Sequence, residues 1–176
     1  FTADDGEHGR ELWVSDGTAA GTHLLKDIWP GTTGSFPTDL ASVGGAVYFG
    51  ASDPVHGREL WKTDGTSAGT MLVKDIDTTV PNAFSTSEPA QFVALPSGDV
   101  LFTANPLDPL TFLRVRQLWR TDGTDAGTVP VIAANTSIAL NPTLLTTFGT
   151  RVLFSADDEF GSPVLWITDE IGRAHV

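Results

Sequence analysis

The sequence predicts an all-β protein built from consecutive copies of one structural repeat. Three observations predict this class: a tryptophan-centred segment recurs, apolar residues alternate along it, and an Asp-Gly turn follows it. The segment reads RELWVSDGTAAGT at 10–22, RELWKTDGTSAGT at 58–70 and RQLWRTDGTDAGT at 116–128. A shorter fourth copy, PVLWITDE, begins at Pro163. Repetition of this kind decides the architecture before any single residue is interpreted.

The copies can be aligned on two aromatic positions. Their tryptophans are spaced 48, 58 and 47 residues apart, at Trp13, Trp61, Trp119 and Trp166. A phenylalanine precedes each tryptophan, at Phe1, Phe49, Phe102 and Phe154. The longer second spacing comes from two insertions, at 78–89 and 105–116. Both are expected in loops, where a repeated unit tolerates insertion.

Within each copy the residues alternate between two faces, as they do in a strand. Leu12 and Val14 lie on one face of the segment ELWVSD (11–16), and Trp13 lies on the other. Both faces are therefore apolar, and such a sheet must be covered on both sides. Because no segment combines a helical period with capping residues, we expect other sheets to supply the cover.

Turn residues divide each full copy into four strands. One hairpin turn is marked by a pair that accepts positive φ, at Asp16-Gly17, Asp64-Gly65 and Asp122-Gly123. A second turn is marked at Gly44-Gly45, Ser97-Gly98 and Phe148-Gly149. In the second copy these turns place strands near 38–43, 47–52, 58–63 and 70–76. We expect fourteen strands, with three, four, four and three in the successive copies.

The last strand of each copy is expected at the edge of its sheet. Lys26 and Lys74 lie on it, and charge on an edge strand discourages pairing with other chains. In the third copy Pro130 takes the place of Leu24 and Leu72, and proline has no N–H to donate to a ladder. Both features favour an edge position.

Four-stranded units that recur and are covered on both faces are typical of a β-propeller, with one copy per blade. The alternative is a β-sandwich, which does not explain units with nearly identical turns. We predict a partial propeller of about 3.5 four-stranded blades, within a single repeat domain over 1–170. The blades are expected at 1–37, 38–88, 89–140 and 141–170. Because a propeller has about 4 to 8 blades, further blades are expected partners of this chain.

The last six residues do not continue the repeat. They read IGRAHV at 171–176 and follow Asp169-Glu170, where Asp-Gly stands in the other copies. The hexapeptide resembles one reading frame of a common sequencing-adapter oligonucleotide. We therefore expect it to be a non-native tail.

The pattern ELWVSDGTAAGTHLLKDI (11–28) resembles the ELWxxDGT repeat proteins, which are large bacterial proteins expected at the cell surface. The flanking segments GEHGR (6–10) and DIWPG (27–31) fit the same family, and the resemblance covers almost the whole chain. It implies a propeller-like array in an extracellular or cell-surface protein. It implies no catalytic residues, because the family has no defined activity to carry over.

Composition restricts the partners. The chain has 22 acidic and 10 basic residues, which give a net charge of -12. Nucleic acids and anionic lipid surfaces attract clusters of Lys and Arg, so we expect neither as a partner. No apolar run approaches the roughly 18 residues that span a bilayer, and membrane insertion is not expected. The chain has no cysteine and therefore no disulfide framework or thiolate metal site.

The repeated carboxylates have a functional and a structural interpretation. Asp16, Asp64 and Asp122 recur in every full copy, whereas an active site needs one copy. We interpret them as turn residues whose carboxylates accept a backbone N–H two residues on. No cofactor is expected, although the oxygen-rich loops at 4–7 and 157–159 leave Ca²⁺ as an alternative.

The residues at the repeated strand positions are interpreted as structural. We expect the repeat tryptophans to pack between blades and not to stack on sugars. Glu11 and Glu59, which precede Leu-Trp, are expected to bond or pair with the neighbouring Arg10 and Arg58.

Three residues are candidates for binding a partner. Trp29 is an unrepeated aromatic beside Pro-Gly. Arg114 and Arg116 lie in the insertion at 105–116, and insertions over a rigid scaffold often carry function. We therefore predict a non-catalytic scaffold that mediates protein or glycan interaction. The alternative is part of a propeller enzyme of glycoside-hydrolase or sialidase type, which needs unrepeated acids such as Glu88 and Asp99 about 5 to 9 Å apart.

Overall fold

The computed structural model describes residues 1–78, 86–131, 140–158, 160–168 and 174–175. All regular structure in these ranges is β, in fifteen strands. The chain divides into two compact units, residues 1–86 and 87–176. Within the described ranges no helix is long and apolar enough to cross a membrane.

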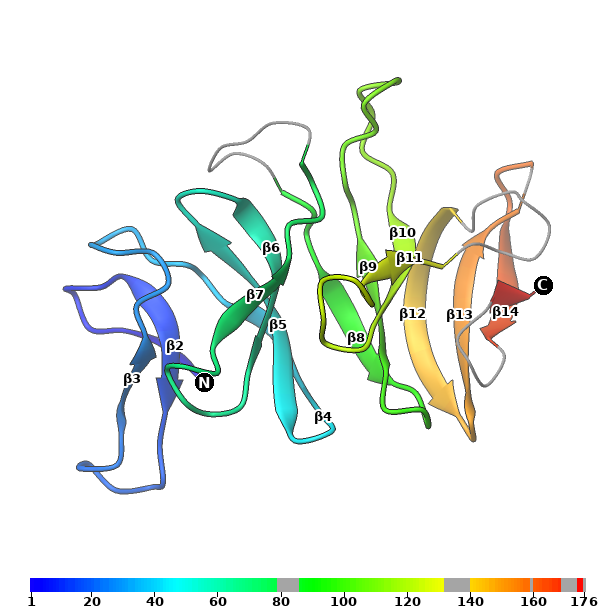
Figure 1. The fold of residues 1–176 in the computed structure, drawn as a ribbon. Helices are drawn as coiled ribbons and strands as arrows, with labels where there is room; N and C mark the ends of the chain where they lie inside the picture. Colours follow the sequence, from blue (N-terminus) through cyan, green and yellow to red (C-terminus); the bar gives the residue numbers. More distant parts are fainter. Residues whose placement is uncertain (79–85, 132–139, 159, 169–173, 176) are drawn as a thin grey trace. The chain divides into compact units, whose positions relative to one another are not determined.

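Unit 1 contains two antiparallel sheets (Figure 1). The first sheet has the order β1-β2-β3 and consists of β1 (Thr2–Asp4), β2 (Arg10–Val14) and β3 (His23–Lys26). The second sheet has the order β4-β5-β6-β7 and consists of β4 (Thr38–Val43), β5 (Ala46–Asp53), β6 (Gly57–Thr63) and β7 (Met71–Lys74). Each strand pairs with the one that follows it, so both sheets are meanders.

Unit 2 repeats this arrangement. The third sheet consists of β8 (Ala90–Ala94), β9 (Val100–Ala104), β10 (Gln117–Thr121) and β11 (Val129–Pro130). The fourth sheet consists of β12 (Leu140–Phe148), β13 (Arg151–Asp157), β14 (Pro163–Thr168) and β15 (Ala174–His175). One residue pair, Gln117 with Leu140, joins β10 to β12. The two sheets of unit 2 are therefore continuous at that point alone among the described pairs.

The all-β prediction is confirmed for the described residues, and β4 to β7 lie where the four strands of the second copy were predicted. The prediction of fourteen strands was wrong, because the fourth sheet has a fourth strand. This strand, β15, lies in the segment 171–176 that was expected to be a non-native tail, and Ala174 and His175 pair with β14. Without β15, the edge of β14 would present unpaired backbone groups, which an extended segment satisfies.

The two aromatic anchors of the repeat are cross-strand neighbours. Phe49 lies opposite Trp61, Phe102 opposite Trp119 and Phe154 opposite Trp166. The ring centroids are 6.4 Å apart in the third sheet and 6.2 Å apart in the fourth. Aromatic pairs at this separation stabilise neighbouring strands. The Phe-to-Trp spacing is 12 residues in three copies and 17 in the third, where the insertion lengthens the loop without changing the pairing.

Each sheet has two apolar faces of different composition. The leucine face carries the leucine of the Leu-Trp motif, at Leu12, Leu60, Leu118 and Leu165. The aromatic face carries the paired phenylalanine and tryptophan and an alanine two residues after the phenylalanine, such as Phe49, Trp61 and Ala51. The two sets separate because successive strand residues point to opposite sides.

In both units the leucine face of one sheet packs on the aromatic face of the next. In unit 1, Leu12 and Leu25 of the first sheet share a core with Phe49, Ala51 and Trp61 of the second. In unit 2 the equivalent core contains Leu101, Leu118, Phe154, Ala156 and Trp166. The same interface is thus built twice from equivalent residues.

The connection between the first two sheets runs beside β2 before it enters β4. Gly34 forms a parallel bridge with Arg10, and Phe36 N–H donates to the Arg10 carbonyl at 3.0 Å. The Ser35 carbonyl accepts a hydrogen bond from Ser52 N–H of the second sheet at 2.9 Å. A Cβ on Gly34 would lie 2.4 Å from Arg10 N, so only glycine allows this approach. The connection therefore belongs to both sheets.

A repeated proline marks the start of each first strand, at Pro37, Pro89 and Pro142. The residue before each proline has positive φ, and so does the second residue after it. The six residues concerned are Phe36, Asp39, Glu88, Gln91, Asn141 and Leu144. The strand register shifts within the same segments. These first strands are therefore bulged in a repeated way, which re-aims the side chains that follow.

The edge strands lie where the sequence predicts them. β3 and β7 end their sheets, and β11, with Pro130, pairs with β10 alone among the described strands. Lys26 has a further role: its ammonium group donates to the Thr70 carbonyl at 2.7 Å and to the Ser67 carbonyl at 3.4 Å, in the second sheet. The edge lysine thus ties one sheet to the next.

Candidate functional site

The Asp-Gly-Thr loops are closed by one repeated hydrogen-bond network. In the second copy, Asp64 Oδ1 accepts from Thr66 N–H at 2.8 Å and from the Thr66 hydroxyl at 2.7 Å. The Thr66 hydroxyl oxygen accepts from Gly69 N–H at 2.9 Å. Asp16 and Asp122 make the same bonds with Thr18 and Thr124. The predicted turn role of the repeated aspartates is confirmed.

The network holds these carboxylates in their ionised form. The Thr66 hydroxyl and N–H stabilise the charged carboxylate and lower the pKa of Asp64. The equivalent threonines lower the pKa of Asp16 and Asp122 in the same way. A group of this kind is a poor general acid at neutral pH.

A glycine at the end of each loop makes room for the aspartate. A Cβ on Gly21, Gly69 or Gly127 would lie 2.0 to 2.1 Å from the aspartate Oδ1 of its own loop. The loops extend beyond the Asp-Gly pair: the first has eight residues, 15–22, and the second and third have seven, 64–70 and 122–128. Gly17, Gly65 and Gly123 nevertheless have the predicted positive φ.

The glutamates of the repeat are fully buried and bind backbone amides of a distant segment. Glu11 Oε1 accepts from Trp29 N–H at 2.9 Å and from Ser35 N–H at 2.8 Å. Glu11 Oε2 accepts from Ile28 N–H at 3.2 Å and from the Ser35 hydroxyl. The expected partner, Arg10, instead donates to the Thr2 hydroxyl oxygen. Four donors explain how a carboxylate is accommodated at zero exposure.

Glu59 occupies the same position in the second sheet. It is also fully buried, and its carboxylate accepts from Ile76 N–H at 2.9 Å and from Asp77 N–H at 3.4 Å. These donors lie 17 and 18 residues after the glutamate, as Ile28 and Trp29 do after Glu11. The repeated contact is structural, and sequence reasoning missed it.

Two aspartate–histidine pairs lie in the loops before the repeat tryptophans. Asp5 Oδ2 lies 2.7 Å from His8 Nδ1, and its Oδ1 accepts from Glu7 N–H and His8 N–H, each at 2.9 Å. These bonds lower the pKa of Asp5 to about 2, and the Asp5 side chain raises the pKa of His8. Asp53 and His56 form the same pair at 2.8 Å. The same pair therefore closes the equivalent loop in the first and the second copy.

A second carboxylate interacts electrostatically with each of these pairs. Burial raises the pKa of Asp75, which interacts electrostatically with His56, Asp77 and Asp53. Asp27 interacts with His8 in the same way in the first sheet. One oxygen each of Asp27 and Asp75 is buried without a hydrogen-bond partner among the described residues. The arrangement is the closest approach to acid–base chemistry in the described chain, and it too is repeated.

The inserted hairpin at 105–116 is ordered by a single aspartate (Figure 1). Asp108 Oδ1 accepts from Leu110 N–H at 2.7 Å and from Thr111 N–H at 3.0 Å, which lowers the pKa of Asp108. Backbone bonds join Asp108 to Phe112 and to Leu113, each at 2.9 Å. The hairpin tip therefore has a defined conformation although it projects beyond β9 and β10.

The hairpin presents apolar and cationic side chains together. Leu110, Phe112 and Leu113 are 88%, 75% and 62% exposed. Arg114 and Arg116 follow on the returning arm and are also exposed, and Arg114 donates to the Asn105 carbonyl at 3.1 Å. The sequence located the insertion and its arginines but not the exposed apolar tip. In the sequence, the apolar residues after Pro109 resemble those of a buried strand. In the structure, the turn around Asp108 places them at the exposed tip of the hairpin.

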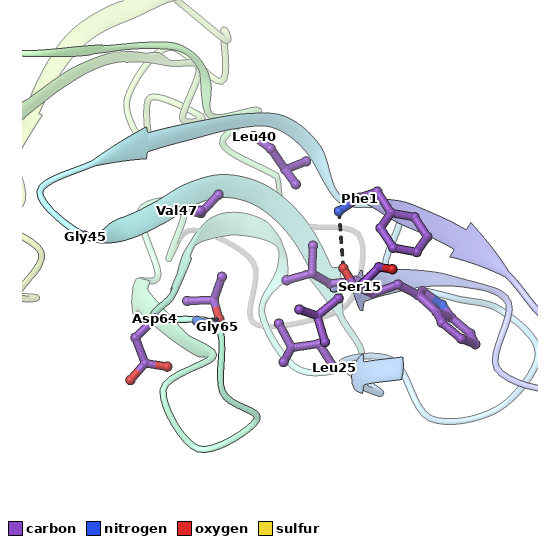
Figure 2. Close-up of a pocket in the computed structure, with 12 residues that line it drawn as sticks. Phe1, Ser15, Leu25, Leu40, Gly45, Val47, Asp64 and Gly65 are labelled. Atoms are coloured by element: carbon purple, nitrogen blue, oxygen red, sulfur yellow. Dashed lines mark hydrogen bonds between the residues drawn. The ribbon is translucent and has the colours of Figure 1, made fainter. Parts of the chain in front are cut away.

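A cavity of about 310 Å³ opens between the two sheets of unit 1 (Figure 2). Its walls are mainly apolar and include Phe1, Leu12, Leu25, Leu40 and Val47. The amino group of Phe1 donates to the Trp13 carbonyl at 3.2 Å across one side of it.

The cavity has little chemistry beyond its apolar walls. Asp64 is the one lining residue with an ionisable side chain, and Figure 2 shows its carboxylate directed away from the cavity. The cavity suits an apolar group, and it brings together none of Trp29, Arg114 and Arg116.

The tryptophans occupy the positions that the repeat predicts. Trp61 and Trp166 lie in the cores between adjacent sheets, which confirms the packing role for these two residues. The indole N–H of Trp166 donates to the Ala156 carbonyl at 3.2 Å. In the described residues the buried indole N–H groups of Trp13, Trp61 and Trp119 have no partner. Trp29 is half-buried, and its backbone N–H binds Glu11.

The unrepeated acids do not form a described pair. Asp99 Oδ2 lies 3.5 Å from Arg120 Nε, an ion pair within the third sheet. Glu88 lies at one of the positive-φ positions before proline. Neither residue lines the cavity. No group of three or more metal-ligating side chains is found among the residues that the structure describes.

The insertion at 78–89 falls largely on residues outside those described, as does Glu159 of the candidate calcium loop. The described part of the chain therefore offers two surfaces with a defined shape, the hairpin tip and the apolar cavity. Comparison of the chain with family models, with curated proteins and with solved structures finds no match.

Proposed function

We propose that the chain is a non-catalytic scaffold of propeller type that mediates protein or glycan interaction as part of a secreted or cell-surface bacterial protein. The observation that carries the proposal is the packing of leucine face on aromatic face, built from equivalent residues in both units. In a propeller, successive four-stranded blades pack in this repeated way. The resemblance to ELWxxDGT repeat proteins supports the cell-surface location.

The use of the acidic residues supports a non-catalytic role. The carboxylates of Asp16, Asp64 and Asp122 close loops, and those of Glu11 and Glu59 bind connecting segments. A carboxylate that accepts several internal hydrogen bonds has little capacity left for a substrate. Most of the acidic side chains at the repeat positions thus make hydrogen bonds that stabilise the fold.

The hairpin at 105–116 is the proposed contact with a partner. Its tip combines exposed Leu110, Phe112 and Leu113 with two arginines, and phenylalanine and arginine are enriched at protein interfaces. The turn around Asp108 holds the tip in one conformation, which lowers the entropy lost on binding. An apolar tip on a structured hairpin favours a protein partner over a glycan.

A hairpin-replacement variant tests this role. Residues 105–116 are replaced by the shorter connection of the second copy, 52–58, and both proteins are screened against a random-peptide display library and a glycan microarray. We expect ligands that bind the natural chain and not the variant. Equal binding to both proteins, or no enrichment on either, would contradict the proposal.

The alternative is part of a propeller enzyme of glycoside-hydrolase or sialidase type. It is favoured by one observation, the raised pKa of Asp75 beside His56, because a general acid needs a pKa nearer to neutral. Release of dye from chromogenic glycosides by the natural chain, lost in Asp75→Asn and kept in the hairpin variant, would support the enzyme. Absence of release under conditions where a partner binds would support the scaffold.

A further inference from the structure

The leucine of the Leu-Trp motif is buried in three sheets and exposed in the fourth. Leu12, Leu60 and Leu118 are 2%, 0% and 1% exposed, whereas Leu165 is 67% exposed. Leu153 and Ile167 are cross-strand neighbours and lie on the same face of the fourth sheet as Leu165. Among the described residues, the leucine face of the fourth sheet is thus an apolar surface without the cover that its equivalents have.

The phenylalanine that precedes each repeat tryptophan shows the opposite pattern of exposure, because it is exposed in the first sheet and buried in the other three. Phe49, Phe102 and Phe154 are 0%, 0% and 1% exposed, whereas Phe1 is 53% exposed. Ala3 and Trp13, on the same face, are half-buried, whereas the alanine and tryptophan of the other three copies are buried. The aromatic face of the first sheet is therefore the second uncovered surface.

The fold itself shows what covers each of these faces. Leu12 is covered by Phe49, Ala51 and Trp61 of the next sheet, and Leu118 is covered by the equivalent Phe154, Ala156 and Trp166. The uncovered leucine face therefore matches an aromatic face, and the uncovered aromatic face matches a leucine face. One chain carries both halves of an interface that it already forms twice.

We infer that copies of this chain associate head to tail, with the leucine face of the fourth sheet in one copy packed on the aromatic face of the first sheet in another. The contact continues the interface between adjacent sheets, with Leu165 in the place of Leu118 and Phe1 in the place of Phe154. Because the two faces differ, the contact is heterologous, and it produces a ring where the rotation closes and an open chain of copies where it does not. The inference rests on the packing between sheets and not on the binding role of the hairpin.

The experiment measures the mass of the purified chain by sedimentation velocity over a concentration series. About 0.5 M salt is used, because each copy carries a net charge of -12 and salt screens the repulsion. Leu165→Glu blocks the leucine face, and Phe1→Glu blocks the aromatic face. Both positions are exposed, and circular dichroism verifies that the variants are folded. Leu110→Glu, at an 88% exposed leucine of the hairpin, is the matched control.

We expect the average mass of the natural chain and of Leu110→Glu to rise with concentration above that of the monomer. Each blocked variant stays monomeric alone, and an equimolar mixture of the two forms a one-to-one complex, since each supplies the face that the other lacks. Ala3→Glu should behave as Phe1→Glu does.

A natural chain that remains monomeric, a mixture that does not associate, or a control that loses association as the face variants do would overturn the inference. Self-association of the Phe1→Glu variant in the absence of the other variant would show that two like faces pack together, which also overturns the inference. Equal ligand binding by the natural chain and the hairpin variant, with head-to-tail assembly intact, would contradict the proposed function alone, so the two failures are distinguishable.

Discussion

Glu11 and Ser35 are joined twice, because the buried carboxylate accepts both the backbone N–H and the hydroxyl of a serine 24 residues further along the chain. The Ser35 carbonyl in turn accepts from Ser52 N–H of the second sheet. A single side chain of the first sheet thus fixes the segment that leads into the second. This relationship explains why a glutamate is found at a completely buried strand position.

The first prediction concerns this tie. Glu11→Gln replaces one acceptor oxygen by an NH₂ group, so at least two donors that face Glu11 lose their partner. An unsatisfied buried donor costs about 1–3 kcal/mol, and we expect a total loss of about 2–4 kcal/mol of unfolding free energy in urea denaturation. Ser35→Ala, which removes one donor, should cost about 1 kcal/mol. Equal stability of Glu11→Gln and the natural chain would show that the tie is not needed.

The second prediction concerns the Asp-Gly-Thr loops. Gly69→Ala places a methyl group where Asp64 Oδ1 lies, 2.1 Å away, and should destabilise the chain by about 1–3 kcal/mol through overpacking. In the Asp64→Ala background the same change meets no carboxylate and should cost less. Thermal melts of the natural chain, both single variants and the double variant complete the cycle. Additive effects in the four melts would rule out the predicted clash.

The third prediction concerns pH. Asp5 has its pKa lowered to about 2, so its contribution to stability is present above pH 4 and is lost as pH falls toward 2. His8 has a raised pKa, so its contribution is complete below pH 6.5 and is lost as pH rises through the raised value. The loop is therefore held best between about pH 4 and pH 6.5.

An NMR titration of the His8 ring protons measures this coupling. Asp5→Asn should return the pKa of His8 toward 6.5, because the Asp5 side chain is the main cause of the shift. Glu7→Gln should change it much less, since Glu7 acts only through a weaker electrostatic interaction. A titration curve of His8 that is the same in Asp5→Asn would contradict the assigned pair.

The fourth prediction compares two leucines at one repeat position. Leu118→Ala leaves a cavity under the aromatic face of the fourth sheet and should cost about 2–5 kcal/mol. Leu165→Ala, at the exposed equivalent position, should stay within about 0.5 kcal/mol when measured on dilute protein. Similar losses for the two variants in chemical denaturation would mean that the two faces do not differ as described.

The strands and the loop positions could be predicted from the sequence because they depend on local patterns. The alternation of residues between two faces predicted β4 to β7. The 12-residue separation of Phe49 and Trp61 reflects their direct cross-strand pairing. The Asp64 turn could be predicted because the donor lies two residues away. Each of these features involves neighbours in the chain or across one hairpin.

The remaining features depend on contacts that no local pattern encodes. The donors to Glu11 are backbone amides in a later connection, which carry no side-chain signature, although the equal spacing to Ile28 and Ile76 was available as a signal. The positive φ of Phe36 and Glu88 arises from the bulge that brings the connection into the next sheet. Proline disfavours helical φ and ψ in the preceding residue, so this geometry was not expected.

Lys26 adds a second tie between the first two sheets, through the carbonyls of Thr70 and Ser67. Glu11 fixes the connection that follows β3, and Lys26 binds the loop between β6 and β7. Separating the first two sheets therefore breaks the charge-assisted bonds of Lys26 as well as the apolar contacts of Leu12 and Leu25.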